Sequence, residues 1–516
     1  MGEYLKNHLQ VIQLYQEIEV RGEMWLQNLD GPNTISETET QNKFRMKKLL
    51  FAAYIVVATA QLCPAQTTKK AQQLDSVFNV LAHQNQFNGS VIIAEKGKIM
   101  LKKGYGFSNE QTKELNNPQT IFELASCSKQ FTAAAIVLLK RQEKLNYEDK
   151  IGKFIPELNF WDKVTIQDLL RHTSGLPSFM GDMQGVWDQT KIATNTDVIN
   201  FYAKRRDTLK FEPKSRHQYS NTNYVILASI IERTSGKTYA NFLSENIFRP
   251  LHMKSTFVYN RREKPKEIKN YATGYVWANA SFNKVVSEDP AYDEKLIYYM
   301  DGVVGHAKVN SNVEDLLKWV AALKTNSLFT QKEFDEMTEV TKTSTGKNIA
   351  YGYGFDVSKK EDKFSFGHTG SWDGYVSFIY QNMIKDRTII VLENFKLGTY
   401  PFKNINEILD NQPISLEFKP SIVLTESQMK KFAGIFIDEK DTAEHHVITY
   451  KQGHLFYNTD KTNYDMRFYP ISANEFKAIR QGGADGVLRF TKLDGGKLKM
   501  EMLQDAEVIG SGTSVE

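Results

Sequence analysis

The sequence has little cysteine and no excess of charge of either sign. Its 516 residues include only two cysteines, and its 65 basic and 61 acidic residues give a formal net charge of +4. Two cysteines are too few for a disulfide scaffold or a cysteine-rich zinc site. The balanced charge gives no electrostatic footprint for nucleic acid, and the sequence has no long stripe of Lys and Arg. We therefore expect no nucleic acid among the partners of this protein.

Long hydrophobic runs are also missing. The apolar stretch over 49–62 is shorter than the roughly 20 residues that a membrane-spanning helix needs. It follows the basic start Met46-Lys47-Lys48 and ends just before Ala65. A basic start, a short apolar run and a small residue before the cut are typical of a secretory signal peptide. We therefore predict a signal peptide over 46–65, behind an upstream extension over 1–45 whose place in the working protein the sequence leaves open.

Removal of this segment has consequences for localisation. We expect an exported protein, periplasmic or secreted, with no stable membrane span after cleavage and with Cys127 as its remaining cysteine. The alternatives are a membrane anchor behind a cytoplasmic tail and lipoprotein processing at Cys63. The short apolar run argues against the anchor. Bulky Leu62 argues against the lipoprotein site, which usually has a small residue at that place.

The order of the predicted elements indicates an α+β domain. A helix over 69–86 and a strand–turn–strand pattern over 90–103 come first. Helical patterns then dominate 121–330, and strand-like runs return over 364–393. Strands at both ends of a helical middle predict a sheet that is joined by distant segments of the chain.

The pattern of apolar and polar residues changes after Pro413. Short alternating runs separated by turn signals fill 433–503, which is typical of a small antiparallel sheet or barrel. We therefore predict a first domain over 66–412, a linker over 413–425 and a small all-β, barrel-like module over 426–516.

The pattern that suggests chemistry is S-x-x-K at Ser126 and Lys129. The same pattern occurs three more times, at 281–284, 344–347 and 427–430, in polar, turn-rich surroundings. Only the match at Ser126 is followed by an almost entirely apolar run, which indicates a buried helix. Context therefore selects this match.

A buried helix would turn these two residues into a nucleophile and its base. Residues three apart on a helix share a face, so Lys129 would lie over the Ser126 hydroxyl. Burial disfavours the charged ammonium and lowers the lysine pKa, so that the amine can accept a proton. The N–H groups at the helix start would point at an oxyanion formed on Ser126. This is a candidate activated serine.

Two further motifs make the chain resemble the serine β-lactamases and penicillin-binding proteins, in particular their class C branch. Tyr219-x-Asn221 is similar to the family's Y-x-N motif, and His368-x-Gly370 is similar to its H-x-G motif. The resemblance covers about residues 70–400, in the family's order and spacing. It implies a β-lactamase/transpeptidase-like catalytic domain, with an antiparallel sheet, flanking helices and a helical subdomain.

The resemblance also implies a role for each matching residue. Ser126 would be the acylated nucleophile, Lys129 its proton acceptor and Tyr219 a proton shuttle. The oxyanion hole would consist of the backbone N–H groups of Ser126 and Ser371. The residues implied to bind substrate are Asn221, His368, Thr369, Gly370 and Ser371. We expect neither a cofactor nor a metal.

His368 departs from the lysine that many class C β-lactamases have in the third motif. Histidine near pH 7 is largely neutral, so we expect its attraction for a substrate carboxylate to be weaker or pH-dependent. Within the resembled family, H-x-G occurs in D-alanyl-D-alanine carboxypeptidases and D-aminopeptidases. We therefore predict a serine hydrolase of that kind, acting on a small molecule or a peptide such as cell-wall peptide. The alternatives are a class C β-lactamase, a carboxylesterase and a penicillin-binding sensor without turnover.

Other candidate residues have simpler interpretations. Cys127, beside the serine, is expected to be a small buried residue rather than a nucleophile. The chain has no G-x-S-x-G elbow of the α/β-hydrolase type. His172 is interpreted as a hydrogen-bonded structural residue. His445 and His446 could suggest a metal, but adjacent residues of a strand point to opposite faces, so we expect ordinary surface residues.

Overall fold

The computed structural model describes most of the chain after residue 68. The described ranges are 69–83, 86–277, 284–289, 296–395, 401–414, 422–451, 453–459, 462–479, 485–504 and 507–515. The predicted extension over 1–45 and the predicted signal peptide over 46–65 lie outside the described residues, as does part of the predicted linker over 413–425.

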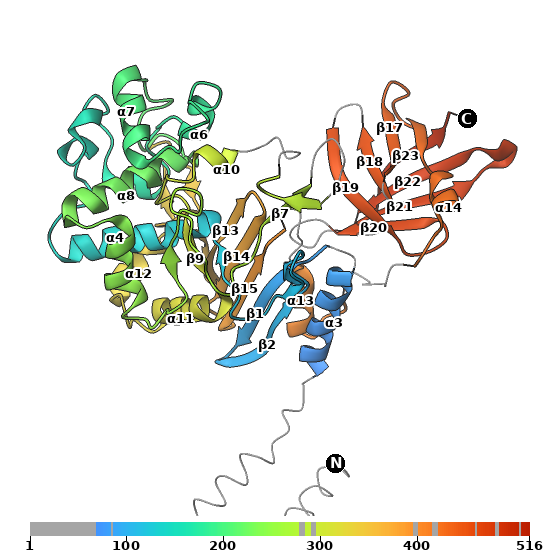
Figure 1. Ribbon diagram of the computed structural model, residues 1–516, viewed down its shortest axis with the longest axis horizontal. Coiled ribbons are helices and arrows are strands. Elements are labelled where there is room, and N and C mark those ends of the chain that lie inside the picture. The colour runs from blue at the N-terminus through green and yellow to red at the C-terminus, as the bar shows by residue number, and fades with distance from the viewer. Residues whose placement is uncertain are drawn as a thin grey trace, which may run out of the picture. The chain divides into compact units, whose positions relative to one another are not determined.

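A six-stranded antiparallel sheet is the largest sheet of the first domain (Figure 1). Its strands are β1 (Gly89–Glu95), β2 (Lys98–Tyr105), β12 (Asp356–Lys360), β13 (Lys363–Trp372), β14 (Tyr375–Asn382) and β15 (Arg387–Glu393). They lie in the order β12-β13-β14-β15-β1-β2. β1 pairs with β15, from Gly89 opposite Glu393 to Glu95 opposite Arg387. The two ends of the domain therefore meet inside one sheet, which confirms the predicted α+β class.

Apolar side chains cover both faces of this sheet. Along β1, Val91 and Ile93 belong to one core and Ile92 to another, because successive side chains of a strand point to opposite faces. The first core includes helix α3 (Lys69–His83), which was predicted over 69–86, and helix α13 (Phe402–Leu409). The second and larger core extends into the helical region.

The helical region follows the first strands, as predicted. Its α-helices are α4 (Lys129–Arg141), α5 (Ile166–Leu170), α6 (Phe179–Met183), α7 (Asn195–Arg205), α8 (Asn221–Ser235), α9 (Tyr239–Leu243), α10 (Leu296–Tyr299), α11 (Val313–Lys324) and α12 (Gln331–Met337). Its 3-10 and π segments are η1 (Ala125–Ser128), η2 (Ile151–Lys153), η3 (Pro156–Leu158) and η4 (Ser244–Phe248). Every residue of α4 from Lys129 to Leu139 is buried, so this helix is enclosed on all sides.

Short strand pairs lie before, within and after this helical region. They are β3 (Phe107–Asn109) with β4 (Glu114–Leu115), β7 (Tyr275–Trp277) with β8 (Lys284–Val286), and β10 (Thr341–Lys342) with β11 (Asn348–Ile349). A three-stranded sheet has the order β5 (Phe122–Glu123), β9 (Val309–Ser311), β6 (Phe257–Val258). Because β5 ends three residues before Ser126, this small sheet fixes the segment that leads to the serine.

The C-terminal module is a closed antiparallel β-barrel, which confirms the predicted all-β class. Its strands are β16 (Gly434–Asp438), β17 (His445–Lys451), β18 (His454–Thr459), β19 (Thr462–Pro470), β20 (Glu475–Ile479), β21 (Asp485–Lys492), β22 (Leu498–Gln504) and β23 (Glu507–Ser514). A helix, α14 (Glu426–Lys430), precedes the strands, and a 3-10 turn, η5 (Asp494–Gly496), joins β21 to β22. Side chains such as Phe468, Phe476 and Leu488 are fully buried in its core. The pairing of β16 with β23 closes the barrel and leaves no strand edge there.

One expectation for the barrel was wrong. His446 is buried rather than a surface residue. Its Nδ1 lies 2.9 Å from the Tyr457 hydroxyl, and its Nε2 lies 2.8 Å from a carboxylate oxygen of Asp438. A buried imidazole needs partners for both nitrogens, and the alternation of a single strand could not show that a barrel would supply them.

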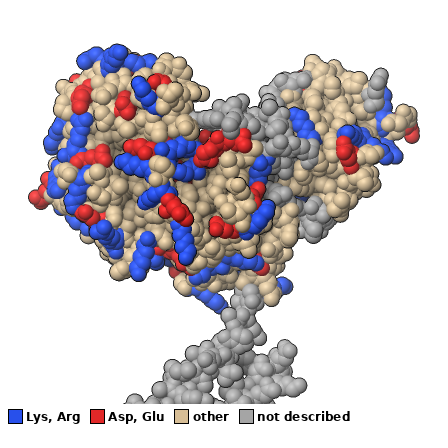
Figure 2. Space-filling model, viewed as in Figure 1, with Lys and Arg blue, Asp and Glu red and all other residues tan. Residues whose placement is uncertain are grey.

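The distribution of charged side chains on the surface agrees with the composition. Figure 2 shows Lys and Arg interspersed with Asp and Glu on the visible face, as the near-balance of 65 and 61 such residues suggests. In the part of the chain that the structure describes, no helix combines the length and the apolar character needed to cross a membrane.

The enclosure of α4 predicts a large loss of stability when its core is opened. Phe131 is fully buried, and its ring centroid lies 4.6 Å from that of Trp319 and 5.4 Å from that of Phe248. We expect Phe131→Ala to lower the free energy of unfolding by about 3 to 5 kcal/mol, through lost burial and the cavity left behind. Urea unfolding measures this. The control is Ile384→Ala at a side chain that is 62% exposed; equal losses in the two variants would contradict the packing described.

Candidate active site

The structure brings the three sequence motifs together around one lysine. Ser126 lies in η1, Lys129 begins α4, and Asn221 begins α8. The third motif, His368 to Ser371, lies in β13, which contacts η1. Three segments that are distant in the sequence therefore meet at the serine: η1 with α4, the start of α8, and β13.

Ser126 stands in a tight turn rather than in the α-helix itself. The preceding residue, Ala125, has a φ of +47°, a left-handed conformation that is unfavourable for a residue with a side chain. Ala125 is the first residue of the 3-10 turn η1, and α4 begins only at Lys129. The expectation of a helix that opens at the serine is thus refined: a strained turn presents Ser126, and the helix behind it holds the lysine.

Lys129 is fully buried and its ammonium group has a complete set of partners. Its Nζ lies 3.1 Å from Ser126 Oγ, 2.8 Å from Asn221 Oδ1 and 2.9 Å from the backbone oxygen of His306. An ammonium has three N–H donors, and these three acceptors use them all. Burial nevertheless disfavours the charge and holds the pKa of Lys129 well below its usual value.

Tyr219 lies beside the same lysine. The Lys129 ammonium is 4.8 Å from the centre of the Tyr219 ring, and the Tyr219 hydroxyl lies close to the Ser126 side chain. Although 41% of the residue's surface is exposed, protein atoms crowd its hydroxyl, and this burial raises the pKa of Tyr219. The phenol therefore keeps its proton near neutral pH and touches both members of the S-x-x-K motif.

His172 holds the turn that carries Tyr219 and Asn221. The backbone N–H of Ser220 donates to His172 Nδ1 at 3.2 Å, and the Asn223 amide nitrogen lies 3.1 Å from the same atom. The rings of His172 and Tyr219 lie with their centroids 4.3 Å apart. These contacts agree with the interpretation of His172 as a hydrogen-bonded structural residue, and they place the Y-x-N motif against the lysine.

Asn221 has a different partner for each half of its amide. Its Oδ1 accepts from Lys129, and its Nδ2 donates to the sulfur of Met180 at 2.8 Å. Met180 belongs to α6 and also packs against Trp372, which follows Ser371 in β13. A thioether is a weak acceptor, so a substrate carbonyl could replace it at the Asn221 amide.

Strand β13 approaches the serine closely at Gly370. A Cβ atom at this position would lie 2.4 Å from the backbone oxygen of Leu124 and 3.1 Å from the backbone nitrogen of Ser126. Cys127, beside the serine, is buried and donates its S–H to the backbone oxygen of His368 at 3.1 Å. Burial raises the pKa of Cys127 to about 12, so it keeps its proton, as expected for a structural thiol.

One edge of β13 is open beside the serine. Strand β12 pairs with β13 from Lys360 opposite Lys363 to Asp356 opposite Gly367, where it ends. The next residues, 368–372, pair only with β14 within the described part of the chain. An open strand edge can accept an extended peptide by backbone hydrogen bonds. Thr369 and Ser371 are exposed along this stretch, whereas His368 and Gly370 are buried.

His368 is therefore not a free cation at this edge. Its Nδ1 lies within hydrogen-bond distance of the Thr369 carbonyl oxygen, which can only accept, so the ring proton is on Nδ1. Its Nε2 then accepts from the Tyr351 hydroxyl at 2.9 Å. Burial, and secondly the charge of Lys129, lower the pKa of His368 to about 3. The ring is thus neutral over the physiological range, which refines the expectation of a pH-dependent attraction for carboxylates.

Sequence reasoning missed two groups of this site. The backbone oxygen of His306 holds the lysine, and no side-chain motif can reveal a carbonyl. Asp356 stands at the end of the open edge, and protein atoms that crowd its carboxyl raise its pKa to about 6 even though the residue is exposed. No motif in the sequence marks this residue. Among the described residues there is no group of three His, Cys, Asp or Glu side chains that could hold a metal.

The fold and the site define a serine hydrolase of the β-lactamase type. The family model described as Beta-lactamase matches residues 74–409, and the chain belongs to this family. It is 35% identical over 357 residues to Penicillin-binding protein 4* of Bacillus subtilis (strain 168), covering 68% of this chain and 79% of that protein.

Solved structures share the fold. A penicillin-binding protein homologue from Pyrococcus abyssi matches with a TM-score of 0.58 and 23% identity, over 86% of this chain and 99% of its own. The family model ends at residue 409, before the barrel begins. The likeness to this structure covers 86% of the chain and therefore extends into the barrel. D-amino acid amidase from Ochrobactrum anthropi SV3 matches with a TM-score of 0.53 and 24% identity, over 67% of this chain and 97% of its own.

The pairing of His368 with Tyr351 predicts a histidine that does not titrate near neutral pH. We expect the ring to stay neutral from pH 8 down to pH 4, because its pKa lies at about 3. NMR of protein with 13C-labelled histidine measures this, with the His368 signal assigned by His368→Gln. A midpoint between pH 6 and 7 for His368 would contradict the geometry described.

Proposed function

We propose that this chain is an exported serine hydrolase that cleaves an amide bond next to a D-amino acid through an acyl-enzyme on Ser126. The observation that carries the proposal is the Lys129 amine, 3.1 Å from Ser126 Oγ and buried so that its pKa is lowered. An amine that is neutral near pH 7 can take the hydroxyl proton as the serine attacks. D-alanyl-D-alanine carboxypeptidase and D-aminopeptidase-like activities both fall within this proposal.

The proposed reaction has two steps. Ser126 Oγ bonds to the substrate carbonyl carbon, its proton passes to Lys129, and the C–N bond breaks as the leaving amine takes a proton through Tyr219. Water then attacks the Ser126 ester, loses a proton through the same two groups, and releases the acid as the serine recovers its own proton. The contacts of Tyr219 with both Ser126 and Lys129 support this proton path.

The strained turn and the open strand edge supply the groups that would bind substrate. The backbone N–H groups of Ser126 and Ser371 are proposed as the oxyanion hole, since Gly370 allows β13 to approach the serine. Asn221 would donate to the substrate amide in place of Met180, and the substrate would lie along the edge from His368 to Ser371.

The relatives support an amide substrate. One is named as a penicillin-binding protein, and another is named as a D-amino acid amidase, whose structure contains L-phenylalanine amide. Penicillins and D-amino acid amides share an amide carbonyl that a serine can attack. This supports amide cleavage for the present chain and does not by itself choose the leaving group.

The charges along the open edge favour a leaving group without a carboxylate. His368 is neutral and already bonded to Tyr351, and Asp356 contributes a carboxylate at the end of the same edge. A substrate carboxylate placed there would meet no cation from His368 and would be repelled by Asp356. D-aminopeptidase-like or amidase-like cleavage is therefore favoured within the proposal over carboxypeptidase and β-lactamase activity.

Export is the second part of the proposal. The basic start at 46–48 and the apolar run over 49–62 support a signal peptide. A periplasmic or secreted location would give the enzyme access to peptides of the cell wall, which contain D-amino acids.

The proposed nucleophile and base can be tested by mass. We expect wild-type protein to gain the mass of an acyl group when mixed with an activated D-amino acid ester or a penicillin, and Ser126→Ala to gain none. Lys129→Met should slow acylation by about 10² to 10⁴-fold, the range for loss of a general base. It should stay folded because methionine is an unbranched apolar side chain that suits a buried position. Lys140→Met on the same helix α4, at a side chain that is 34% exposed, is the matched control.

The same measurement separates the alternative activities. A penicillin adduct that persists for hours without turnover supports a sensor, and rapid penicillin hydrolysis supports a β-lactamase. Turnover of simple esters without cleavage of any D-amino acid amide supports a carboxylesterase. Near-normal acylation of Lys129→Met would overturn the proposed mechanism for all of these activities.

The charge of the open edge predicts a preference between two matched substrates. We expect D-phenylalanyl-D-alanine amide to be cleaved with a kcat/KM at least roughly fivefold higher than D-phenylalanyl-D-alanine, since repulsion of about 1 kcal/mol or more is expected between two charges 4 Å apart. The preference should shrink as the pH falls below the Asp356 pKa of about 6, because the protonated carboxyl no longer repels the substrate. Steady-state kinetics between pH 5 and 8 measure this.

Asp356→Asn should remove most of this preference at pH 8. Asp362→Asn is the matched control, because Asp362 is exposed in the turn between β12 and β13 and lies beyond their paired residues. A wild-type preference for the free carboxylate, or equal effects of the two variants, would refute the role given to Asp356.

A further inference from the structure

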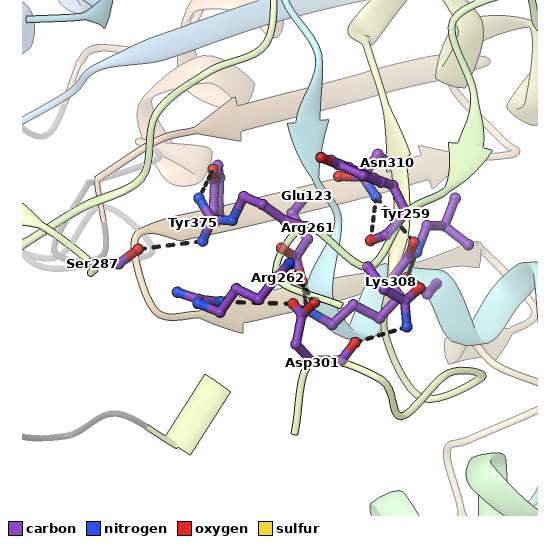
Figure 3. Close-up of polar contacts among 12 residues, drawn as sticks. Glu123, Tyr259, Arg261, Arg262, Ser287, Asp301, Lys308, Asn310 and Tyr375 are labelled. Carbon is purple, nitrogen blue, oxygen red and sulfur yellow. Dashed lines mark hydrogen bonds and ion pairs between the residues drawn. The ribbon is translucent and has the colours of Figure 1, made fainter. Parts of the chain in front are cut away.

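A second buried lysine lies behind the catalytic groups. Lys308 is fully buried, and its Nζ lies 2.9 Å from Glu123 Oε1 and 2.8 Å from Asp301 Oδ1 (Figure 3). Both carboxylates are themselves buried to 1% exposure or less. Buried charges are expensive to keep unless they are well paired, so this cluster has a strong geometric requirement, and nothing in the proposed reaction uses it.

Lys308 closes the loop that holds Lys129. The loop over 301–308 begins at Asp301 and ends at Lys308, so their ion pair joins its two ends. Between them lies His306, whose backbone oxygen accepts from Lys129 at 2.9 Å. Lys308 has a φ of +80°, an unfavourable conformation for a residue with a side chain, and its buried ion pairs hold it there.

The same ammonium also joins this loop to β5, the strand that precedes the Ser126 turn. Glu123 belongs to β5, directly ahead of the turn that presents Ser126, and β5 pairs with β9 after the loop. The Leu124 backbone N–H donates to the oxygen of Val309 at 2.9 Å, and the Val309 N–H donates to Ser128 Oγ at 3.0 Å. The Lys308–Glu123 ion pair thus lies beside two hydrogen bonds that join the serine turn to the end of the loop over 301–308.

A third segment of the site touches Lys308 as well. Its ammonium lies 5.5 Å from the centre of the Trp372 ring, and Trp372 follows Ser371 at the open edge of β13. Trp372 also packs against Ala125, the strained residue before the serine. The nucleophile turn, the loop that holds the lysine and the end of the substrate strand therefore share one buried cation.

We propose that Lys308 is a positioning residue, whose ion pairs with Glu123 and Asp301 fix the His306 carbonyl and the Ser126 turn relative to Lys129. The proposal rests on the proposed acyl-serine chemistry. We call these two ion pairs the Lys308 clamp. Without the clamp, the loop over 301–308 would relax and water would reach the Lys129 amine.

The surroundings explain why Asp301 stays ionised beside Lys308. Burial would raise the pKa of Asp301, but Lys308 and the backbone N–H groups of Arg262 and Glu263 lower it overall. The Arg262 guanidinium lies 3.7 Å from Asp301 as well. Asp301 is therefore ionised at every pH at which the enzyme would act, and Lys308 always has an anionic partner.

The expected effect on Lys129 has a definite sign. Lys129 has a lowered pKa because it is desolvated. Its titratable neighbours are Cys127, His172, Tyr219, Tyr224, His306 and His368. Entry of water would move the lysine pKa back up. At neutral pH a larger share of the amine would then be protonated and unable to act as a base.

The test measures Ser126 reactivity with a fluorophosphonate between pH 5 and 10. In this reaction Ser126 Oγ bonds to phosphorus, fluoride leaves, and the hydroxyl proton passes to Lys129. The variant is Lys308→Met with Glu123→Gln, which removes one charge of each sign and leaves the net charge unchanged. We expect the acid limb of the rate profile to move up by about one pH unit or more, and labelling at pH 7 to slow by about tenfold, since one pKa unit is tenfold.

The matched control is Arg387→Met with Glu95→Gln. Arg387 is also a buried cation between two carboxylates, Glu95 and Asp410, but it joins β15, β1 and α13, which carry no residue of the candidate site. We expect this control to lose stability and to keep the wild-type profile. Thermal unfolding and circular dichroism of both double variants show whether each is folded.

The outcomes separate this inference from the proposed function. If wild-type protein is not labelled at Ser126 at any pH, the acyl-serine mechanism and the positioning role both fail. If wild type is labelled and the Lys308 variant keeps its profile, only the positioning role fails. If the double variant does not fold, Glu123→Gln alone is used, because it removes the ion pair between Lys308 and β5 and keeps the ion pair between Lys308 and Asp301. An unchanged pH profile of labelling for this single variant likewise overturns the positioning role.

Discussion

The site depends on one ammonium group that is kept away from water. Lys129 can act as a base only if burial lowers its pKa, and burial is possible only if its three N–H groups find acceptors inside the protein. The enclosed helix α4 provides the burial. A serine turn, the start of α8 and a backbone carbonyl from a distant loop provide the acceptors, and the surrounding architecture holds these in place.

The residues around that lysine keep the site almost free of other positive charge. His172, His306 and His368 are all buried near it, and in each case burial lowers the pKa first and the charge of Lys129 lowers it further. A protonated histidine in any of these places would repel the lysine and change its proton affinity. Histidine in the third motif is therefore compatible with this site as a neutral hydrogen-bonding group, which is a different role from that of a lysine.

The sequence could predict those parts of the site that are carried by side chains in short motifs. The apolar run after Lys129 indicated the buried helix, and ordered motifs indicated that Tyr219, Asn221 and His368 would meet it. The His306 carbonyl, the Lys308 clamp and the edge position of Asp356 depend on how β5 pairs with β9 and where β12 stops along β13. Such registers are set by tertiary packing, and a single sequence has no local signal for them.

The pairing of β1 with β15 has a consequence for how the protein is made. Gly89 lies opposite Glu393, so the central sheet joins segments about 300 residues apart in the chain. Contacts of such long range slow folding, because the entropy of closing the loop is lost before the contacts form. During synthesis from the N-terminus, β1 has no permanent neighbour on that side until residue 393 has left the ribosome. The catalytic domain therefore cannot complete its fold on a shorter nascent chain, and its early strand must stay unpaired there until synthesis of the domain is nearly over.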